Sequence, residues 1–423
     1  MKKRVLSFIL AVVLITSILP AFPALAGTAW DGSSKSEPQQ IDGVYQISDS
    51  AQLAWFAEKS KTQSDINAVL TDDIDLGGKE WTPIGMAASG YVTESYSGTF
   101  DGQGHTVSGL YINTSSAFYG FFYCVYGGTV KNLNVIGDVT TTKNTAGGIV
   151  GKLQGGTVEN CSFDGSVKAN GNYVGGIVAN IVTNSKAASV ITGCCNSGEI
   201  SGKYAGGILG YTTAKADINN CYNTGTINGT TRSAGISGQQ TAGAISYCYN
   251  IGNSASGISG FSNAAITNCY YLNDETAAPG GTATGYEKIT DKAILLENLN
   301  AGESKLFCED IGNKNNGYPV LNWQNKLSPE EEAEEQRKRE NAEKVKQAVE
   351  ALSLEAQTIK EECTLNLPSQ IGDCTVEWSS DNTDIISDAG MVILPEKNIV
   401  TVTLTATVTC DTCLLYTSPS PRD

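Results

Sequence analysis

Histidine, whose ordinary pKa suits proton transfer near neutral pH, is scarce in this 423-residue chain. The chain has one histidine, His105, in the segment Asp-Gly-Gln-Gly-His-Thr at 101–106. A histidine-based triad or a multi-histidine metal site therefore has a single candidate. The glycines beside His105 favour a turn that leads into a strand, so a turn or core role is the simpler interpretation.

Clustered carboxylates are the second group that could do chemistry, because a pair of them can hydrolyse a glycosidic bond. Asp72, Asp73 and Asp75 lie together, and Asp164 and Asp217 occur further along the chain. Asp73 and Asp75 would share one strand face, where they could also bind Ca²⁺. No motif ties these acids to a reaction, so we predict no catalytic residue, no metal site and no cofactor.

Cysteines number 12, and five of them recur at one position of a repeated pattern: Cys161, Cys194, Cys221, Cys248 and Cys269. Leu133 takes that position in an earlier unit, which indicates small apolar fillers of an inward column. Stacked coils would place the cysteines within disulfide range, but we favour unpaired thiols. One column lacks the tetrahedral grouping of a metal site. Elsewhere Cys363 and Cys374 could pair, and the sequence leaves this open.

Tyr222, Tyr249 and Tyr270 each follow one of these cysteines. Alternation along a strand would turn the three rings outward on one face. A row of exposed rings could bind sugars, which makes these tyrosines the candidate ligand-binding residues. The alternative is a row that only stabilises its sheet.

The elements that would position these residues are internal repeats. Pairs of a β-branched residue and, three positions later, Leu or Cys recur at 130/133, 158/161, 191/194, 218/221, 245/248 and 266/269. Each pair follows a second element, of which Gly147-Gly-Ile-Val-Gly151 is the fullest copy. Asn-x-Gly turns follow at 196–198, 223–225 and 250–252.

Units of this size cannot bury an apolar face alone, so they must stack. The pattern predicts an all-β fold, a parallel β-solenoid in which equivalent residues lie about 4.8 Å apart. Inward Ile and Val would form continuous rows, and Asn side chains would hydrogen-bond along a turn. A β-sandwich of hairpins is the alternative, but the fixed offset within each unit favours stacking.

At these residues the sequence resembles the GLUG-motif proteins, which are extracellular proteins of Gram-positive bacteria. Segments at 43–57, 70–76, 81–85, 99–107 and 316–323 resemble the flanks of that family, so the resemblance covers about residues 40 to 325. Residues 347–410 resemble an atypical bacterial immunoglobulin-like domain, in which Trp378 would be a core residue. The resemblance implies surface spacers or adhesive modules, although a fold does not determine function.

The sequence predicts seven segments along the chain. Residues 1–26 form an export signal: Lys2 to Arg4 are basic, 5–19 are apolar, and Ala24-Leu25-Ala26 precedes the cleavage site. An N-terminal cap with the first coils (27–98) contains a helix within 48–60. The repeats (99–273), a C-terminal cap (274–327) with a helix near 294–299, a charged helical linker (328–346) and the immunoglobulin-like domain (347–410) follow. Residues 411–423 resemble a translated sequencing adapter and are left outside the predicted fold.

The formal net charge is −16, which argues against nucleic acid as a partner. No second long apolar run follows the signal, so we expect no membrane span in the mature chain. We predict a monomeric, secreted or cell-surface protein, attached through a region beyond the end of this sequence. Its predicted role is non-catalytic, adhesin-like or structural, with a surface glycan or host protein as ligand. The alternative is a carbohydrate-active or glycan-binding module of a larger enzyme.

Overall fold

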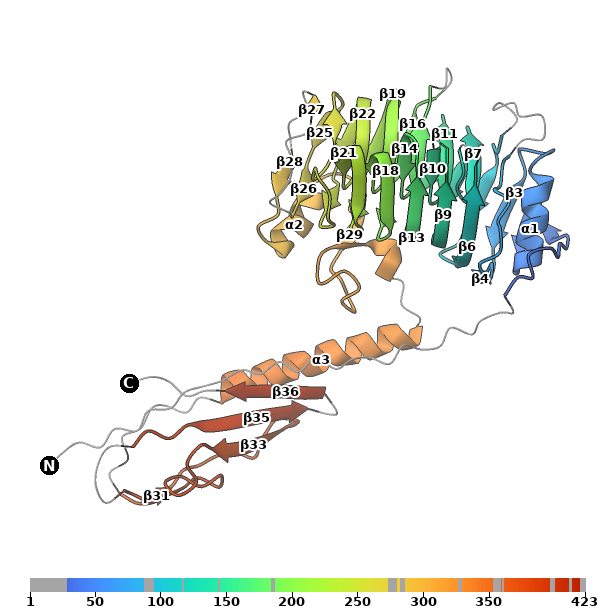
Figure 1. Ribbon diagram of the computed structural model, residues 1–423. Coiled ribbons are helices and arrows are strands. Elements are labelled where there is room, and N and C mark those ends of the chain that lie inside the picture. The colour runs from blue at the N-terminus through green and yellow to red at the C-terminus, as the bar shows by residue number, and fades with distance from the viewer. Residues whose placement is uncertain are drawn as a thin grey trace. The chain divides into compact units, whose positions relative to one another are not determined.

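The computed structural model describes residues 29–86, 95–115, 118–143, 145–183, 187–272, 280–281, 286–325, 329–352, 359, 361–395, 400–410 and 413–418. These form two compact units, one ending at residue 325 and the other starting at residue 329 (Figure 1). The predicted export signal at 1–26 lies outside the described residues. Within the described ranges, no helix is both long and apolar enough to cross a membrane.

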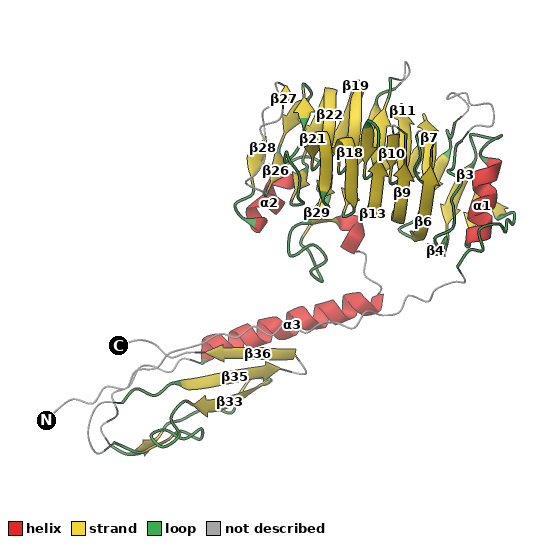
Figure 2. Ribbon diagram, viewed as in Figure 1, coloured by secondary structure: helices red, strands yellow, loops and turns green. Residues whose placement is uncertain are grey.

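The first unit is built from two large sheets whose strands alternate along the chain (Figure 2). One sheet contains β1 (Gln39–Ile41), β2 (Val44–Ile47), β3 (Asn67–Leu70), β5 (Thr99–Asp101), β7 (Phe122–Tyr126), β8 (Thr129–Lys131), β11 (Val150–Gln154), β12 (Thr157–Glu159), β15 (Val178–Ile181), β16 (Ser189–Thr192), β19 (Leu209–Asn219), β22 (Ser237–Ser246), β24 (Phe261–Ser262), β25 (Ala265–Thr267) and β27 (Gly280–Gly281). The other contains β4 (Ile74–Asp75), β6 (Thr106–Thr114), β9 (Asn134–Thr141), β10 (Thr145–Gly147), β13 (Ser162–Ala169), β14 (Tyr173–Gly175), β17 (Cys195–Asn196), β18 (Glu199–Gly206), β20 (Tyr222–Asn223), β21 (Ile227–Ala234), β23 (Tyr249–Asn250), β26 (Cys269–Tyr271) and β28 (Tyr286–Lys288).

Strand register confirms the predicted parallel β-solenoid, which has about six turns. The β-branched residues of the repeat pair directly with one another from coil to coil: Val130, Val158, Ile191, Ile218, Ile245 and Ile266. All six are buried. Each coil therefore contributes one layer to an interior that no coil could close alone.

The glycine pairs form the tight corners between β10 and β11, and between the equivalent strands of later coils. At Gly207 an added Cβ would lie 2.2 Å from the Gly235 carbonyl oxygen and 2.4 Å from Asn223 Oδ1. At Gly148 it would lie 2.3 Å from the ring of Phe163. The second glycine of each pair thus packs against the side chain that follows the cysteine by two positions. This contact explains why the two repeat elements occur together.

Two rows of asparagines run along the solenoid. The expected turn row is present: Asn196 donates to Asn223 at 2.7 Å, and Asn223 donates to Asn250 at 2.8 Å, all buried. A second, interrupted row directly precedes the Leu and Cys positions and was not predicted; Gly193 and Tyr247 take two of its six places. Its members, Asn132 and Asn160 among them, have φ near +51°, a conformation that asparagine tolerates better than most residues.

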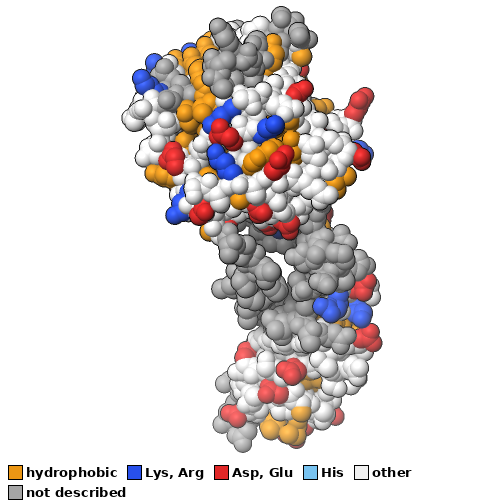
Figure 3. Space-filling view, turned by 90° about the vertical axis from the view of Figure 1, so that its right-hand side faces the viewer, with side chains coloured by type: hydrophobic (Ala, Val, Ile, Leu, Met, Phe, Trp, Pro, Cys, Tyr) orange, Lys and Arg blue, Asp and Glu red, His pale blue; other side chains and the backbone are white. Residues whose placement is uncertain are grey.

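Helix α1 (Ser50–Lys59) closes the N-terminal end of the solenoid, within the range predicted for a helix. Asp49 caps it by accepting a hydrogen bond from the backbone of Gln52 at 2.8 Å. Leu53, Phe56 and Ala57 are buried against the first coils. Figure 3 views this end, where acidic and basic side chains are interspersed with small apolar patches.

The chain after β28 contains α2 (Lys292–Leu299), β29 (Phe307–Cys308), β30 (Val320–Leu321) and the 3₁₀ helix η2 (Asn322–Asn325). We call residues 289–325 the C-terminal strap. The strap does more than close the last coil, because it runs back along the lateral face over β23, β20 and β17.

The second unit contains α3 (Pro329–Ala351), β31 (Cys363–Thr364), β32 (Gln370–Ile371), β33 (Cys374–Ser380), β34 (Met391–Val392), β35 (Leu404–Cys410) and β36 (Cys413–Ser418). The end of α3 differs from a solvated linker, since Val345 and Ala348 are buried with Val376 and Val408. Trp378 is half-buried between the two apolar clusters of this unit.

A further detail of this unit differs from the sequence analysis. The disulfide joins Cys374 to Cys410, whereas Cys363 is an exposed free thiol. The pairing of β33 with β35 places Cys374 and Cys410 opposite each other, which the sequence alone did not indicate. Strand β36 pairs antiparallel with β35.

Candidate functional site

The structure buries the three tyrosines that the sequence nominated as ligand-binding residues. Tyr222, Tyr249 and Tyr270 are 5%, 0% and 8% exposed, so the prediction of an exposed row is wrong. Their side chains do leave the solenoid on one face, and the rings of Tyr222 and Tyr249 stack with centroids 5.0 Å apart. The C-terminal strap covers that face.

The hydroxyls of Tyr222 and Tyr249 are bonded to the strap. Tyr249 donates its hydroxyl hydrogen to the carbonyl of Pro319 and accepts from Asn315 Nδ2 at 2.7 Å. Tyr222 donates to Gln324 Oε1 at 2.9 Å. Burial raises the pKa of both phenols well above the usual range. The tyrosines therefore hold the strap in place rather than face a ligand.

The repeated cysteines form an interior column of free thiols. Cys161, Cys194, Cys221, Cys248 and Cys269 are fully buried, and each donates its thiol hydrogen to the carbonyl two residues earlier, at 3.1–3.3 Å. Burial raises the pKa of Cys161, Cys194, Cys221 and Cys269. Since the thiolate is the reactive form, burial disfavours reaction of these four thiols in the folded chain.

The candidate acids and His105 are dispersed and locally bonded. Asp73 Oδ1 lies 3.2 Å from His105 Nδ1 and accepts from the backbone of Thr106 at 2.8 Å. Asp164 lies on β13 and Asp217 on β19, which belong to different sheets. Among the described residues, no three His, Cys, Asp or Glu side chains come together as a metal group would.

An open hollow of about 590 Å³ lies on the strap, between α2 and the loop that follows β29. Two of its charged side chains, Asp310 and Lys292, are engaged within the protein. The Asp310 carboxylate accepts hydrogen bonds from the backbone of Lys314, Asn315 and Gly317 at 2.7–2.9 Å. Lys292 donates to the carbonyl of Asn316. These bonds hold the loop in place, so the Asp310 carboxylate and the Lys292 ammonium group are occupied within the protein.

A different surface gathers aromatic and cationic side chains, along the corner that the glycine pairs form. Strand register aligns Tyr173, Tyr204 and Arg232 in one column, just before the glycines. Tyr211 and Gln239 align in a second column, just after them, on β19 and β22. We call this surface the corner strip; its side chains are Phe118, Lys152, Tyr173, Lys203, Tyr204, Tyr211, Arg232, Gln239 and Phe261.

Three rings form the centre of the corner strip. Tyr173 and Tyr211 stack across the corner, with centroids 4.1 Å apart and an interplanar angle of 16°. Tyr204 lies 5.8 Å from Tyr173 and 5.6 Å from Tyr211, at steeper angles. All three are half-buried, so part of each ring faces solvent. This arrangement presents apolar ring surface beside phenol hydroxyls.

Three cations of the corner strip rest on its rings. The Arg232 guanidinium lies 4.0 Å from the Phe261 centroid and 5.8 Å from that of Tyr204, and it donates to Gln239. Lys203 lies 5.6 Å from the Tyr204 centroid, and Lys152 lies 5.0 Å from that of Phe118. None of the three forms an ion pair with a described carboxylate.

The sequence analysis missed this surface, although a signal for it was present. Tyr173 and Tyr204 stand two residues before a glycine pair, in Tyr-Val-Gly-Gly and Tyr-Ala-Gly-Gly. Arg232 takes the same position before Ala234-Gly235. A comparison of the outward-facing positions from coil to coil would have shown that this position carries Tyr173, Tyr204 and Arg232.

Comparison with known families supports both resemblances. Residues 144–168 and 201–228 match the GLUG motif, and residues 342–414 match the atrophied bacterial Ig domain. The chain carries GLUG repeats and an atrophied bacterial Ig domain. The second GLUG match contains Lys203, Tyr204 and Tyr211 of the corner strip.

Among solved structures, the "putative immunoglobulin A1 protease" from Bacteroides ovatus is similar to this chain. It has a TM-score of 0.52 and 22% sequence identity, and the match covers 68% of this chain and 95% of that one. At this identity the likeness concerns the fold alone. A comparison with curated proteins gives no significant match.

Proposed function

We propose that this chain is a secreted or cell-surface protein that engages an extracellular ligand without catalysis, as an adhesin-like module. The observation that carries the proposal is the corner strip, where half-buried rings lie on successive coils beside cations that form no ion pair with a carboxylate of the described residues. Aromatic and arginine side chains of this kind dominate binding energy at recognition surfaces. The export signal predicted at 1–26 and the Ig-like second unit agree with an extracellular location.

The proposal is tested by immobilising the full chain without residues 1–26 and presenting polysaccharides, neutral and charged, and host extracellular proteins. We expect saturable binding of at least one of them, with weaker binding by Arg232→Gln. Binding by none of these ligands would remove the proposal.

The alternative of a carbohydrate-active module is separated from it by an activity measurement on the same ligands. Reducing-end release would show hydrolysis, and absorbance of unsaturated products would show lyase cleavage. We expect neither with the wild-type chain. A rate that disappears on substitution of Asp73, Asp164 or Asp217 would favour the enzyme instead.

A further inference from the structure

We infer that the corner strip binds an extended anionic polysaccharide, laid along the axis of the solenoid. This inference rests on the proposed function and specifies its ligand class. The corner strip offers apolar ring faces for the C–H faces of sugar rings, and fixed cations for carboxylate or sulfate groups on them.

The charged residues of the corner strip are all cations, whereas the chain as a whole has a net charge of −16. Elsewhere on the solenoid, Lys131 lies 3.3 Å from a carboxylate oxygen of Asp101, and Lys168 lies 3.9 Å from one of Glu199. Lys152, Lys203 and Arg232 instead lie against aromatic rings. The rings hold these cations in place, and N–H donors of the cations remain able to hydrogen-bond to an incoming anion.

The length of the corner strip indicates a polymer rather than a small ion. Phe118 belongs to the same coil as β7, and Phe261 lies on β24, five coils further along the stack. At about 4.8 Å per coil, the strip spans roughly 24 Å. Lys152 lies near one end of the strip and Arg232 near the other, and Lys203 lies beside the central Tyr204.

The geometry of the rings favours sugars over other anionic polymers. Tyr173 and Tyr211 already stack on each other at 4.1 Å, so no base can insert between them. Each offers at most its outer face and its hydroxyl, and a pyranose ring can use both, through its C–H face and its hydroxyl groups. The overall negative charge further opposes nucleic acid, whose affinity comes mainly from phosphate contacts.

The test titrates the full chain without residues 1–26 with four polymers. Polygalacturonate carries carboxylates, and heparin carries sulfates as well. Polyglutamate and single-stranded DNA are anionic polymers that contain no pyranose rings. We expect saturable binding of polygalacturonate or heparin, weakened by added salt, and much weaker binding of polyglutamate and DNA. The stronger of the two sugar polymers identifies the anionic group.

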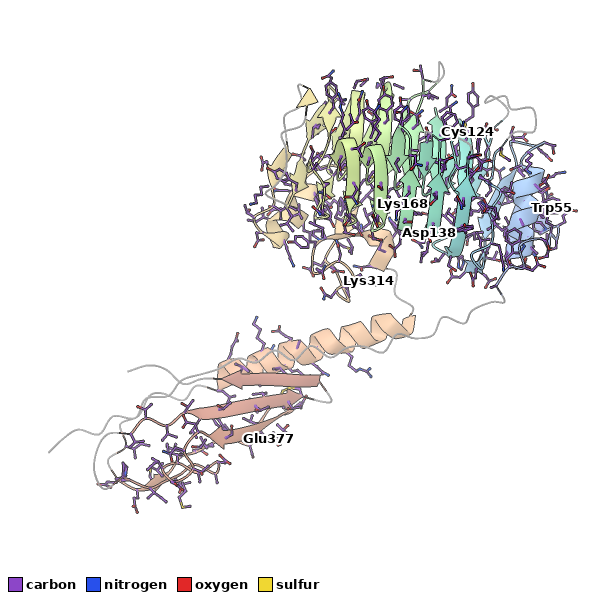
Figure 4. The ribbon with its side chains drawn as sticks, in the orientation of Figure 1. Trp55, Cys124, Asp138, Lys168, Lys314 and Glu377 are labelled. Carbon is purple, nitrogen blue, oxygen red and sulfur yellow. A yellow bond between two sulfur atoms is a disulfide. The ribbon has the colours of Figure 1, made fainter. Side chains whose placement is uncertain are left out.

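Substitutions then locate the binding to the corner strip. Arg232→Gln should weaken binding by about tenfold, the effect of losing one charged hydrogen-bond partner, and Lys152→Gln with Lys203→Gln should weaken it further. Tyr204→Leu should weaken it while keeping an apolar side chain. The matched control is Lys168→Gln, which removes the same charge from another part of the solenoid and should bind as wild type (Figure 4). Circular dichroism of each variant checks its fold.

The inference is overturned if neither sugar polymer binds, if the strip variants bind as wild type, or if polyglutamate or DNA binds as tightly as the sugars. Such a failure is distinct from failure of the proposed function. Binding of a neutral glycan or of a host protein would preserve the proposed function while excluding an anionic polysaccharide.

Discussion

The side-chain amide of Asn196 donates from Nδ2 to Oδ1 of Asn223 at 2.7 Å, from one coil to the next. Asn223 repeats the bond toward Asn250 at 2.8 Å, and each Nδ2 also donates to the carbonyl two residues ahead in its own turn. All three side chains are buried, so these bonds satisfy the Nδ2 donors of the row without water and join successive coils.

Replacing the middle member of this row tests its contribution. Asn223→Ala removes bonds on both sides and leaves buried donors and acceptors unpaired, so we expect a loss of about 2–4 kcal/mol in the free energy of unfolding. The measurement is chemical denaturation followed by far-UV circular dichroism. Asn228→Ala, on the surface of the same coil, is the control and should change the midpoint little.

The glycine corner gives a second prediction. Gly207→Ala would place Cβ 2.2 Å from a carbonyl oxygen and 2.4 Å from Asn223 Oδ1, contacts that only a backbone shift relieves. We expect a loss of roughly 3 kcal/mol or more, the upper range for single substitutions. Gly127→Ala is the comparison, since it has φ +73° and open space. Its cost should be limited to about 1–2 kcal/mol of backbone strain. Equal costs would show that packing at the corner is not critical.

The thiol column predicts a loss of stability at alkaline pH. Burial raises the pKa of Cys221 in the folded chain, so the unfolded chain releases this proton first as the pH rises. The stabilisation is complete below the unfolded pKa of about 8.5 and falls as the pH rises above it. Cys221→Ala should reduce the slope of unfolding free energy against pH by up to about 1.4 kcal/mol per unit between pH 9 and 11. Cys363→Ala, at an exposed site, should leave the slope unchanged.

The contact between Tyr249 and the strap predicts a structural rather than a binding effect. Tyr249→Phe keeps the ring but removes one hydrogen bond to the Pro319 carbonyl and one from the Asn315 amide, which still bond to each other, so we expect a loss of about 1–2 kcal/mol. Limited proteolysis should show faster cleavage within residues 289–325. Tyr111→Phe, on an exposed side chain, should show neither change. A Tyr249→Phe variant with unchanged cleavage would mean that the strap is held by other contacts.

Reduction of the disulfide should affect the second unit alone. The bond between Cys374 and Cys410 closes a loop with a sequence separation of 36, for which loop entropy predicts a stabilisation of about 4 kcal/mol. Calorimetry with and without reductant should show the transition of residues 329–418 at lower temperature and that of the solenoid unmoved. Cys363→Ser should leave both transitions in place. A reductant effect that persists in Cys374→Ala would assign it to another pair.

Much of the solenoid followed from local patterns in the sequence. The offset of three between each β-branched residue and Leu or Cys recurs in six coils, and the glycine pairs and the Asn-x-Gly turns recur in three coils each. Stacking converts such a repeat directly into rows, because the coil above presents the same residue at the same place. The thiol column and the Asn196 row could therefore be foreseen, as could the helix that closes the N-terminal end.

The tertiary structure alone decided which outward residues remain accessible. Tyr222 and Tyr249 point outward as alternation requires, yet a segment far along the chain covers them. Trp323 of that segment bonds to Gly193, 130 positions earlier, and no local pattern records such a contact. The corner strip and the Cys374–Cys410 pairing likewise depend on which strands meet. The sequence by itself determined the stacked coil and its interior, since those depend on repeated short-range spacing. Which surface is covered and which can meet a ligand depends on long-range packing, and only the folded chain decided it.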